Sequence, residues 1–92
     1  MEKLTEKELM CLIDRLIEEK IEQNQEFLRF TFYEVMVKEK VPNSQENEFN
    51  MLAKNKLNNM RYIVYLQDQE FIYNEAKMRV QPNELLIAVK ER

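Results

Sequence analysis

The stretch VPNSQENEFNMLAKNKLNNMR, residues 41–61, decides how the rest of the chain is arranged. Val41 precedes Pro42, and because a residue before proline avoids the α region, any helix that arrives here must end. Asn43 or Ser44 can cap a new helix, and Glu46 in its first turn complements the helix dipole. Apolar residues then recur at helical spacing, and they predict a buried face made of Phe49, Leu52, Ala53, Leu57 and Met60.

Two further helices are expected before this stretch. Thr5 and Glu8 have the capping-box spacing, and the apolar residues that follow them predict an amphipathic helix over residues 6–24. Thr31 and Glu34 repeat that spacing and predict a shorter helix toward residue 40. The apolar run at residues 27–33 alternates in a way that is equally compatible with a short strand.

The sequence after residue 61 changes to β-branched and aromatic residues. We expect Tyr62–Leu66 and residues 71–73 to pair as a β-hairpin, to which residues 78–80 can add a third strand. The run at 85–89 is either a buried strand or a short helix that begins at Asn83, since periodicity does not separate the two. A short apolar element of this kind is a common place for a dimer contact.

Composition limits the chemistry that is available to the chain. Its 92 residues predict a single domain over residues 1–92, and 45% hydrophobic with 34% charged residues is typical of a folded protein. It contains no glycine, which argues against phosphate-cradling loops. With no histidine and one cysteine, zinc fingers, Cys-His pairs and serine triads are excluded. We expect no enzyme activity, no metal and no cofactor.

The cellular location is predicted from the cysteine and the hydropathy. Cys11 cannot form an internal disulfide, which fits a reducing compartment. The N-terminal residues are charged and do not resemble a signal peptide, and no stretch is apolar enough to span a membrane. We therefore expect a cytoplasmic protein that does not associate with a membrane.

Charge is distributed unevenly although the net charge is only −3. Residues 1–26 contain eight acids and four bases, whereas residues 49–67 contain three bases and no acid. A phosphate backbone responds to the local patch more than to the charge of the whole chain. The helix that contains this basic segment is therefore the candidate site for a nucleic acid.

Spacing places a polar stripe on that helix opposite its apolar face. The stripe consists of Asn47, Asn50, Lys54, Asn58 and Arg61, with Asn55 and Lys56 beside it. Amide side chains can bind adenine edges, and Lys or Arg can bind guanine or phosphate. A solvated helix surface that lacks acids by chance explains the same pattern equally well.

Four successive segments of the chain are TFYEVMVKEK, VPNS, ENEFNMLAKNKLNNM and RYIVYLQDQEFIYN. In this order they resemble the supporting helix, the turn, the recognition helix and the wing of small winged helix-turn-helix DNA-binding proteins of Gram-positive mobile elements, such as TcpK-like plasmid transfer accessory factors and phage regulators. The resemblance covers most of residues 5–80. It implies an α+β fold, with a helix-turn-helix between an N-terminal helix and a C-terminal β-hairpin. The tip of this wing is acidic, so the loop that contains Lys77 and Arg79 is an alternative DNA contact.

Two functional hypotheses follow. The first is sequence-specific binding of double-stranded DNA as a homodimer, in plasmid or phage DNA transfer or in transcription control. The second is a small protein-binding module, such as an antirepressor, an anti-defence factor or an antitoxin-like inhibitor, that uses the acidic first helix.

Overall fold

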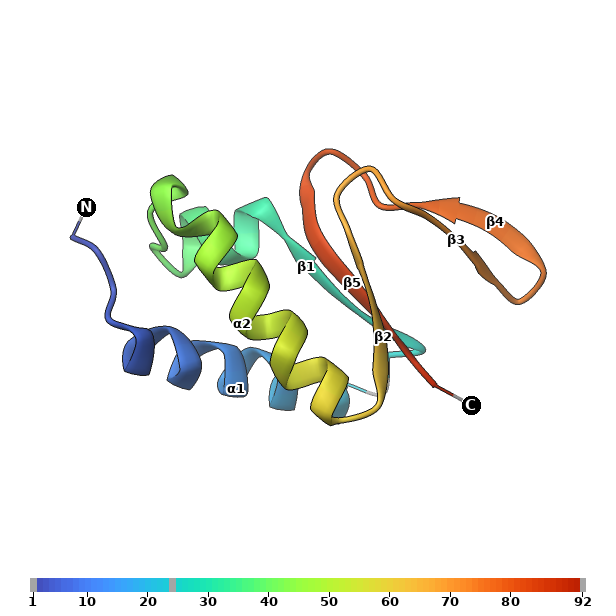
Figure 1. Cartoon of the computed structure of the whole chain (residues 1–92), viewed down its shortest axis with the longest axis horizontal. Coiled ribbons are helices and arrows are strands. Elements are labelled where there is room, and N and C mark those ends of the chain that lie inside the picture. The colour runs from blue at the N-terminus through green and yellow to red at the C-terminus, as the bar shows by residue number, and fades with distance from the viewer. Residues whose placement is uncertain (1, 24, 92) are drawn as a thin grey trace.

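The computed structural model describes residues 2–23 and 25–91. These residues form an α+β fold in which two α-helices lie on one side of an antiparallel sheet and a hairpin extends from its other side (Figure 1). In chain order the elements are α1 (Glu6–Glu22), β1 (Phe27–Thr31), the π-helical η1 (Tyr33–Lys38), the 3₁₀ turn η2 (Asn43–Gln45), α2 (Glu46–Asn59), β2 (Tyr62–Leu66), β3 (Glu70–Tyr73), β4 (Ala76–Arg79) and β5 (Glu84–Lys90). The predicted α+β class is confirmed.

The capping box predicted for α1 is present. The Thr5 hydroxyl accepts from the Glu8 N–H at 3.1 Å, and the Glu8 carboxylate accepts from the Thr5 N–H at 3.0 Å. These bonds hold the pKa of the Glu8 carboxyl below its ordinary value, with the backbone N–H of Thr5 as the main cause. The helix is assigned only as far as Glu22, and the predicted end at Asn24 lies outside the described residues.

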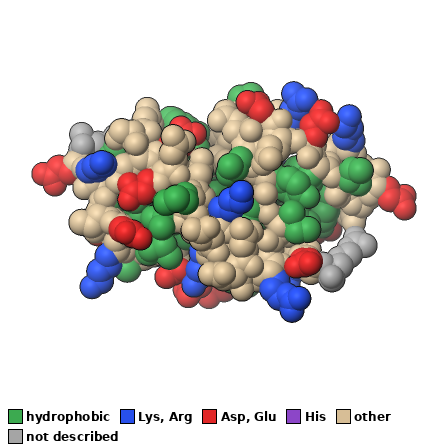
Figure 2. Space-filling view, in the orientation of Figure 1, with side chains coloured by type: hydrophobic (Ala, Val, Ile, Leu, Met, Phe, Trp, Pro, Cys, Tyr) green, Lys and Arg blue, Asp and Glu red, His purple; other side chains and the backbone are tan. Residues whose placement is uncertain are grey.

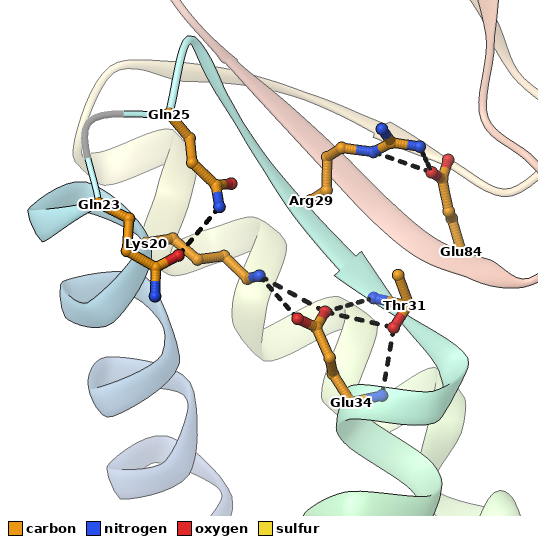
Figure 3. Close-up of polar contacts among 7 residues, drawn as sticks. All are labelled: Lys20, Gln23, Gln25, Arg29, Thr31, Glu34 and Glu84. Carbon is orange, nitrogen blue, oxygen red and sulfur yellow. Dashed lines mark hydrogen bonds and ion pairs between the residues drawn. The ribbon is translucent and has the colours of Figure 1, made fainter.

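Residues 27–38 form both a strand and a helix, the two structures between which the sequence pattern did not decide for the start of this segment. The apolar run forms β1, and the predicted short helix follows it as η1, a π-helix that ends at Lys38, two residues before Lys40. Glu34 joins the two elements, because its carboxylate accepts from the Thr31 N–H at 3.1 Å and lies 3.2 Å from the Lys20 ammonium (Figure 3). Lys20 is almost fully buried, and this contact provides its counter-charge.

α2 has the predicted buried face, but it begins differently from the prediction. Neither Asn43 nor Ser44 caps it with a side chain; both lie in the 3₁₀ turn that precedes it. The buried Gln45 instead binds the segment before α1, since its side chain exchanges two hydrogen bonds of 2.8 Å with the backbone of Leu4. The buried residues of α2 are Phe49, Leu52, Ala53 and Leu57, whereas Met60 is half-buried.

The predicted pairing of the strands is wrong. β2 and β3 do not form a hairpin with each other: β2 pairs with β5, and β3 pairs with β4. β5 also pairs with β1, so the sheet has the order β1-β5-β2 with β5 in the centre. The run at 85–89 is therefore a strand and not a helix. Both of its edges are paired, and Leu85, Leu86 and Ile87 are buried, so little of this strand is available for the expected dimer contact.

The two faces of the sheet pack against different parts of the chain. Leu86 and Ala88 point toward the helices and belong to the main hydrophobic core. Ile87 and Val89 alternate to the other face, where they pack with Phe71 and other residues of the β3–β4 hairpin. Consequently the hairpin and α2 are on opposite faces of the sheet, and the hairpin projects away from α2 (Figure 1).

Candidate functional site

Four polar residues of α2 point into solvent, as the sequence predicted. Asn47, Lys54, Asn55 and Asn58 are exposed, and none of them has a side-chain partner among the described residues. Their orientation follows from helix periodicity, because the opposite side of α2 is buried against the main core. We call these four residues the open face of α2.

Two other predicted residues lie at the margins of the open face. Arg61 is exposed just after α2 with φ of 66°, and its N–H donates to the Asn58 carbonyl at 3.0 Å. Asn50 is half-buried, and its Oδ1 is buried without a hydrogen-bond partner among the described residues. This oxygen is therefore an unsatisfied hydrogen-bond acceptor. The Asn50 side chain is less available to a ligand than the side chains of the open face.

Lys56 points away from the open face. Its ammonium lies 3.3 Å from Oδ1 of Asp14 on α1, and only 39% of its side chain is exposed. Two residues apart on a helix are separated by about 200° around the axis, so Lys54 and Lys56 cannot share one face. The prediction that Lys56 lies beside the polar stripe is therefore wrong.

Lys77 and Arg79 lie on β4 and are not brought to α2. Both pair with Glu70 on β3, at 3.2 Å from Lys77 and 2.7 Å from Arg79. The hydrogen bond from Arg79 is the main cause that lowers the pKa of the Glu70 carboxyl, and the same pair raises the pKa of Arg79. Since their hairpin packs on the far face of the sheet, these two residues do not belong to one surface with the open face of α2.

Charge on the side of the molecule where α2 lies is mixed. Figure 2 shows separate acidic and basic side chains on this side, with neither a continuous acidic surface nor a continuous basic one. Two apolar side chains reach solvent: Met51 on α2 is 56% exposed, and Ile72 on β3, which the sequence pattern did not single out, is 76% exposed. Met51 contributes an apolar contact surface to the side of α2 that carries its polar residues.

The described part of the chain offers neither a metal site nor a membrane-spanning helix. Within residues 2–23 and 25–91, no group of three or more Asp, Glu, Cys or His side chains is placed to hold a metal ion. No helix in those same ranges has the length and apolar character that crossing a membrane requires. Cys11 is exposed and forms no disulfide. The chain matches no protein-family model, no curated protein and no solved structure.

Proposed function

We propose that this chain is a non-catalytic protein with a winged-helix-like arrangement, and that it binds double-stranded DNA sequence-specifically by placing α2 in the major groove. The chain order of helix, strand, helix, helix, strand, hairpin and strand supports this proposal. The sheet order β1-β5-β2, with the hairpin inserted between β2 and β5, also supports it. One fold can host many functions, so the side chains of the site carry more weight for this proposal than the order of the elements.

The observation that carries the proposal is the open face of α2. It combines three amides and one lysine that have no internal partners, and residues 49–67 contain no carboxylate that would repel phosphate. Asn can pair bidentately with adenine, and Lys can bind guanine or phosphate, so a helix with this face suits major-groove binding. α2 has 14 residues and is long enough to contact several base pairs.

In the proposed binding mode, α2 contacts the duplex and the hairpin does not. The hairpin lies on the other face of the sheet, and its two basic residues are paired with Glu70. With Lys54 and Arg61 as the exposed cations near α2, one copy neutralises few phosphates and binds weakly. Two copies on adjacent half-sites restore affinity, which is why the proposal includes a dimer. A role in DNA transfer or transcription control of a mobile element is proposed from the resemblance.

A salt titration with fluorescently labelled duplexes tests this proposal. The full chain should retain duplex DNA at low salt, and Lys54→Glu should abolish retention because it places a carboxylate against phosphate. Asn55→Ala should reduce the discrimination between the preferred base and the other bases at one position of the bound site by about 1–3 kcal/mol. Binding to duplexes from a random library measures this difference. Failure of the unmodified chain to retain any duplex at low salt contradicts the proposal, and so does unchanged binding by Lys54→Glu.

A second candidate function is a protein-binding module that uses α1. The observation that favours it is that Glu18 and Glu22 are exposed and form no ion pair among the described residues. If this module operates, Glu18→Lys combined with Glu22→Lys abolishes capture of a basic partner, whereas Lys54→Glu leaves capture intact. Loss of duplex binding by Lys54→Glu, with duplex binding retained by Glu18→Lys combined with Glu22→Lys, supports the DNA-binding proposal instead.

A further inference from the structure

The outer edge of β2 presents backbone groups that the sheet does not use. The Glu91 N–H donates to the Arg61 carbonyl at 3.1 Å, which fixes the alternation of hydrogen bonds between β2 and β5. By that alternation Ile63 and Tyr65 bond to β5, whereas the N–H and C=O groups of Tyr62, Val64 and Leu66 point outward.

Gln69 closes one end of this edge. Its side-chain oxygen accepts from the Leu66 N–H at 2.5 Å, and its own N–H donates to the Leu66 carbonyl at 3.1 Å. The outward groups of Tyr62 and Val64 have no such partner among the described residues. They form a short, open segment of strand edge.

The two edges of the sheet differ in how they are protected. Edge strands usually carry a charge, a proline or a bulge that prevents pairing with another chain. β1 has both a charge, Arg29, and a register irregularity between Phe30 and Thr31. β2, with the sequence YIVYL, pairs in regular register and has none of these features. β2 is therefore the edge that is suited to accept another strand.

A groove of about 720 Å³ lies beside this edge, between the sheet and the β3–β4 hairpin. Its apolar lining includes Ile63 and Ile72, which are 46% and 76% exposed, together with Tyr65 and Val89. Hydrophobic side chains gather on this part of the molecule in Figure 2. A large exposed isoleucine on each side of a groove is typical of a surface that a partner covers.

The charged side chains around the groove are mainly acidic. Glu26, Glu75 and Glu91 line it, and Glu26 also accepts from the Tyr73 hydroxyl at 3.3 Å. Among the described residues the lining also includes Lys90, whose ammonium lies 5.7 Å from the centre of the Tyr62 ring, and Tyr62 packs toward the helices. The groove therefore combines an apolar floor with a negative rim.

We propose that β2 accepts an extended, basic peptide segment of a partner protein as an added strand. Backbone bonds to Tyr62 and Val64 hold the segment, and its alternate apolar side chains enter the groove between Ile63 and Ile72. Lysine or arginine residues flank those side chains and meet Glu75 and Glu91. The groove opens on the hairpin face of the sheet, so this site is separate from the open face of α2 and goes beyond the proposed DNA binding.

Charge favours a basic peptide over a second copy of the chain. Antiparallel pairing of β2 with β2 of another copy has a two-fold axis perpendicular to the sheet, so both hairpins and both grooves lie on one face. The carboxylates of Glu75 and Glu91 would then face a second set of the same charge across the axis. A basic peptide instead neutralises these carboxylates.

Binding of short labelled peptides to the full chain tests the proposal. The probe is Lys-Lys-Val-Thr-Val-Lys-Lys, and the matched peptide has glutamate in place of every lysine. The lysine peptide should bind at least about tenfold more tightly than the glutamate peptide. Two N-methylated isomers of the lysine peptide, blocked on alternate residues, should differ, because only one set of N–H groups faces β2.

Variants of the chain locate the site. Ile72→Lys, and separately Glu75→Lys with Glu91→Lys, should each weaken peptide binding by about tenfold. All three positions are exposed, so the fold is retained, and circular dichroism checks it. Glu2→Lys with Glu6→Lys is the control with the same charge change, since both residues are exposed and line neither the groove nor a proposed binding surface. It should leave peptide binding unchanged, as should Lys54→Glu.

Three results would overturn the proposal: no binding of the lysine peptide at low salt, equal binding of both peptides, or equal binding of both N-methylated isomers. Self-association that Ile63→Lys abolishes would also overturn it, because a second copy would then occupy the edge. Since Lys54→Glu tests the DNA proposal and does not touch the groove, failure of one proposal is distinguishable from failure of the other.

Discussion

The ammonium of Lys56 on α2 lies 3.3 Å from Oδ1 of Asp14 on α1. This ion pair directs Lys56 toward the neighbouring helix, whereas Lys54, two residues earlier, is exposed and has no such partner among the described residues. The two lysines therefore differ in what they can contact, although their side chains are identical. They provide a matched pair for testing which side of α2 binds DNA.

Neutralising these two lysines should have unequal effects on DNA binding. Lys54→Gln should reduce the slope of log K against log salt by about one, as expected for the loss of one phosphate contact. Lys56→Gln should change the slope by less, because its charge is partly balanced by Asp14. Anisotropy titrations at several salt concentrations give both slopes. If both variants reduce the slope equally, the DNA does not distinguish the two sides of α2 and must contact a different surface.

Removing the basic residues of the hairpin should not weaken DNA binding. Lys77→Gln with Arg79→Gln alters side chains that pair with Glu70 on the far side of the sheet from α2, so duplex affinity should stay within about twofold. The same titration measures this. A drop of about tenfold or more would show that the hairpin contacts DNA and that the helix does not act alone.

Two arginine–glutamate pairs should contribute unequally to stability. Glu84 is only 2% exposed, and its carboxylate accepts from the Arg29 guanidinium (Figure 3). It also accepts from the Gln81 N–H at 3.0 Å. Arg29→Ala should lower the free energy of unfolding by about 1–3 kcal/mol, because it leaves a buried charge with fewer partners. Arg79→Ala breaks an exposed pair that solvent screens, and its effect should be clearly smaller than that of Arg29→Ala. Urea unfolding compares the two, and equal losses would contradict the account.

Acid should weaken the fold partly through Glu34. Burial raises the pKa of this carboxyl, but bonds from the Thr31 backbone and from Lys20 outweigh it, so the pKa falls below the ordinary 4.5. A lowered pKa in the folded state means that the contribution of Glu34 is fully present above pH 4.5 and is lost as the pH falls through the folded pKa. Glu34→Gln should therefore flatten the decline of unfolding free energy below pH 4.5. If the unfolding free energy of Glu34→Gln declines with pH as steeply as that of the unmodified chain, Glu34 does not contribute to the loss of stability in acid.

Local signals in the sequence were sufficient for the helices. The apolar spacing of α1 and α2 and the Thr5–Glu8 capping box are short-range features, and the structure contains them as predicted. The run at 85–89 remained ambiguous because a strand that is buried on both faces has no alternation to separate it from a helix. Its burial depends on α2 and on the hairpin, which are distant in sequence.

Strand pairing and the site required three-dimensional information. β2 pairs with β5 across the inserted hairpin, and a pattern in Tyr62–Leu66 alone cannot identify a partner that far along the chain. The prediction of a basic surface counted Lys56, Lys77 and Arg79 as available cations. Each of them has a carboxylate within ion-pair distance in the fold, from Asp14 or Glu70, and no spacing rule in the sequence indicates those pairs.

The most direct measurement is an amide NMR titration of the full chain with duplex DNA selected from a random library. If α2 binds DNA through its open face, the largest shifts on addition of the duplex cluster at Asn47, Lys54, Asn55 and Asn58, while β3 and β4 change little. Shifts concentrated on β2 and the hairpin, or no shifts at low salt, would contradict the central claim that α2 is the nucleic-acid-binding element.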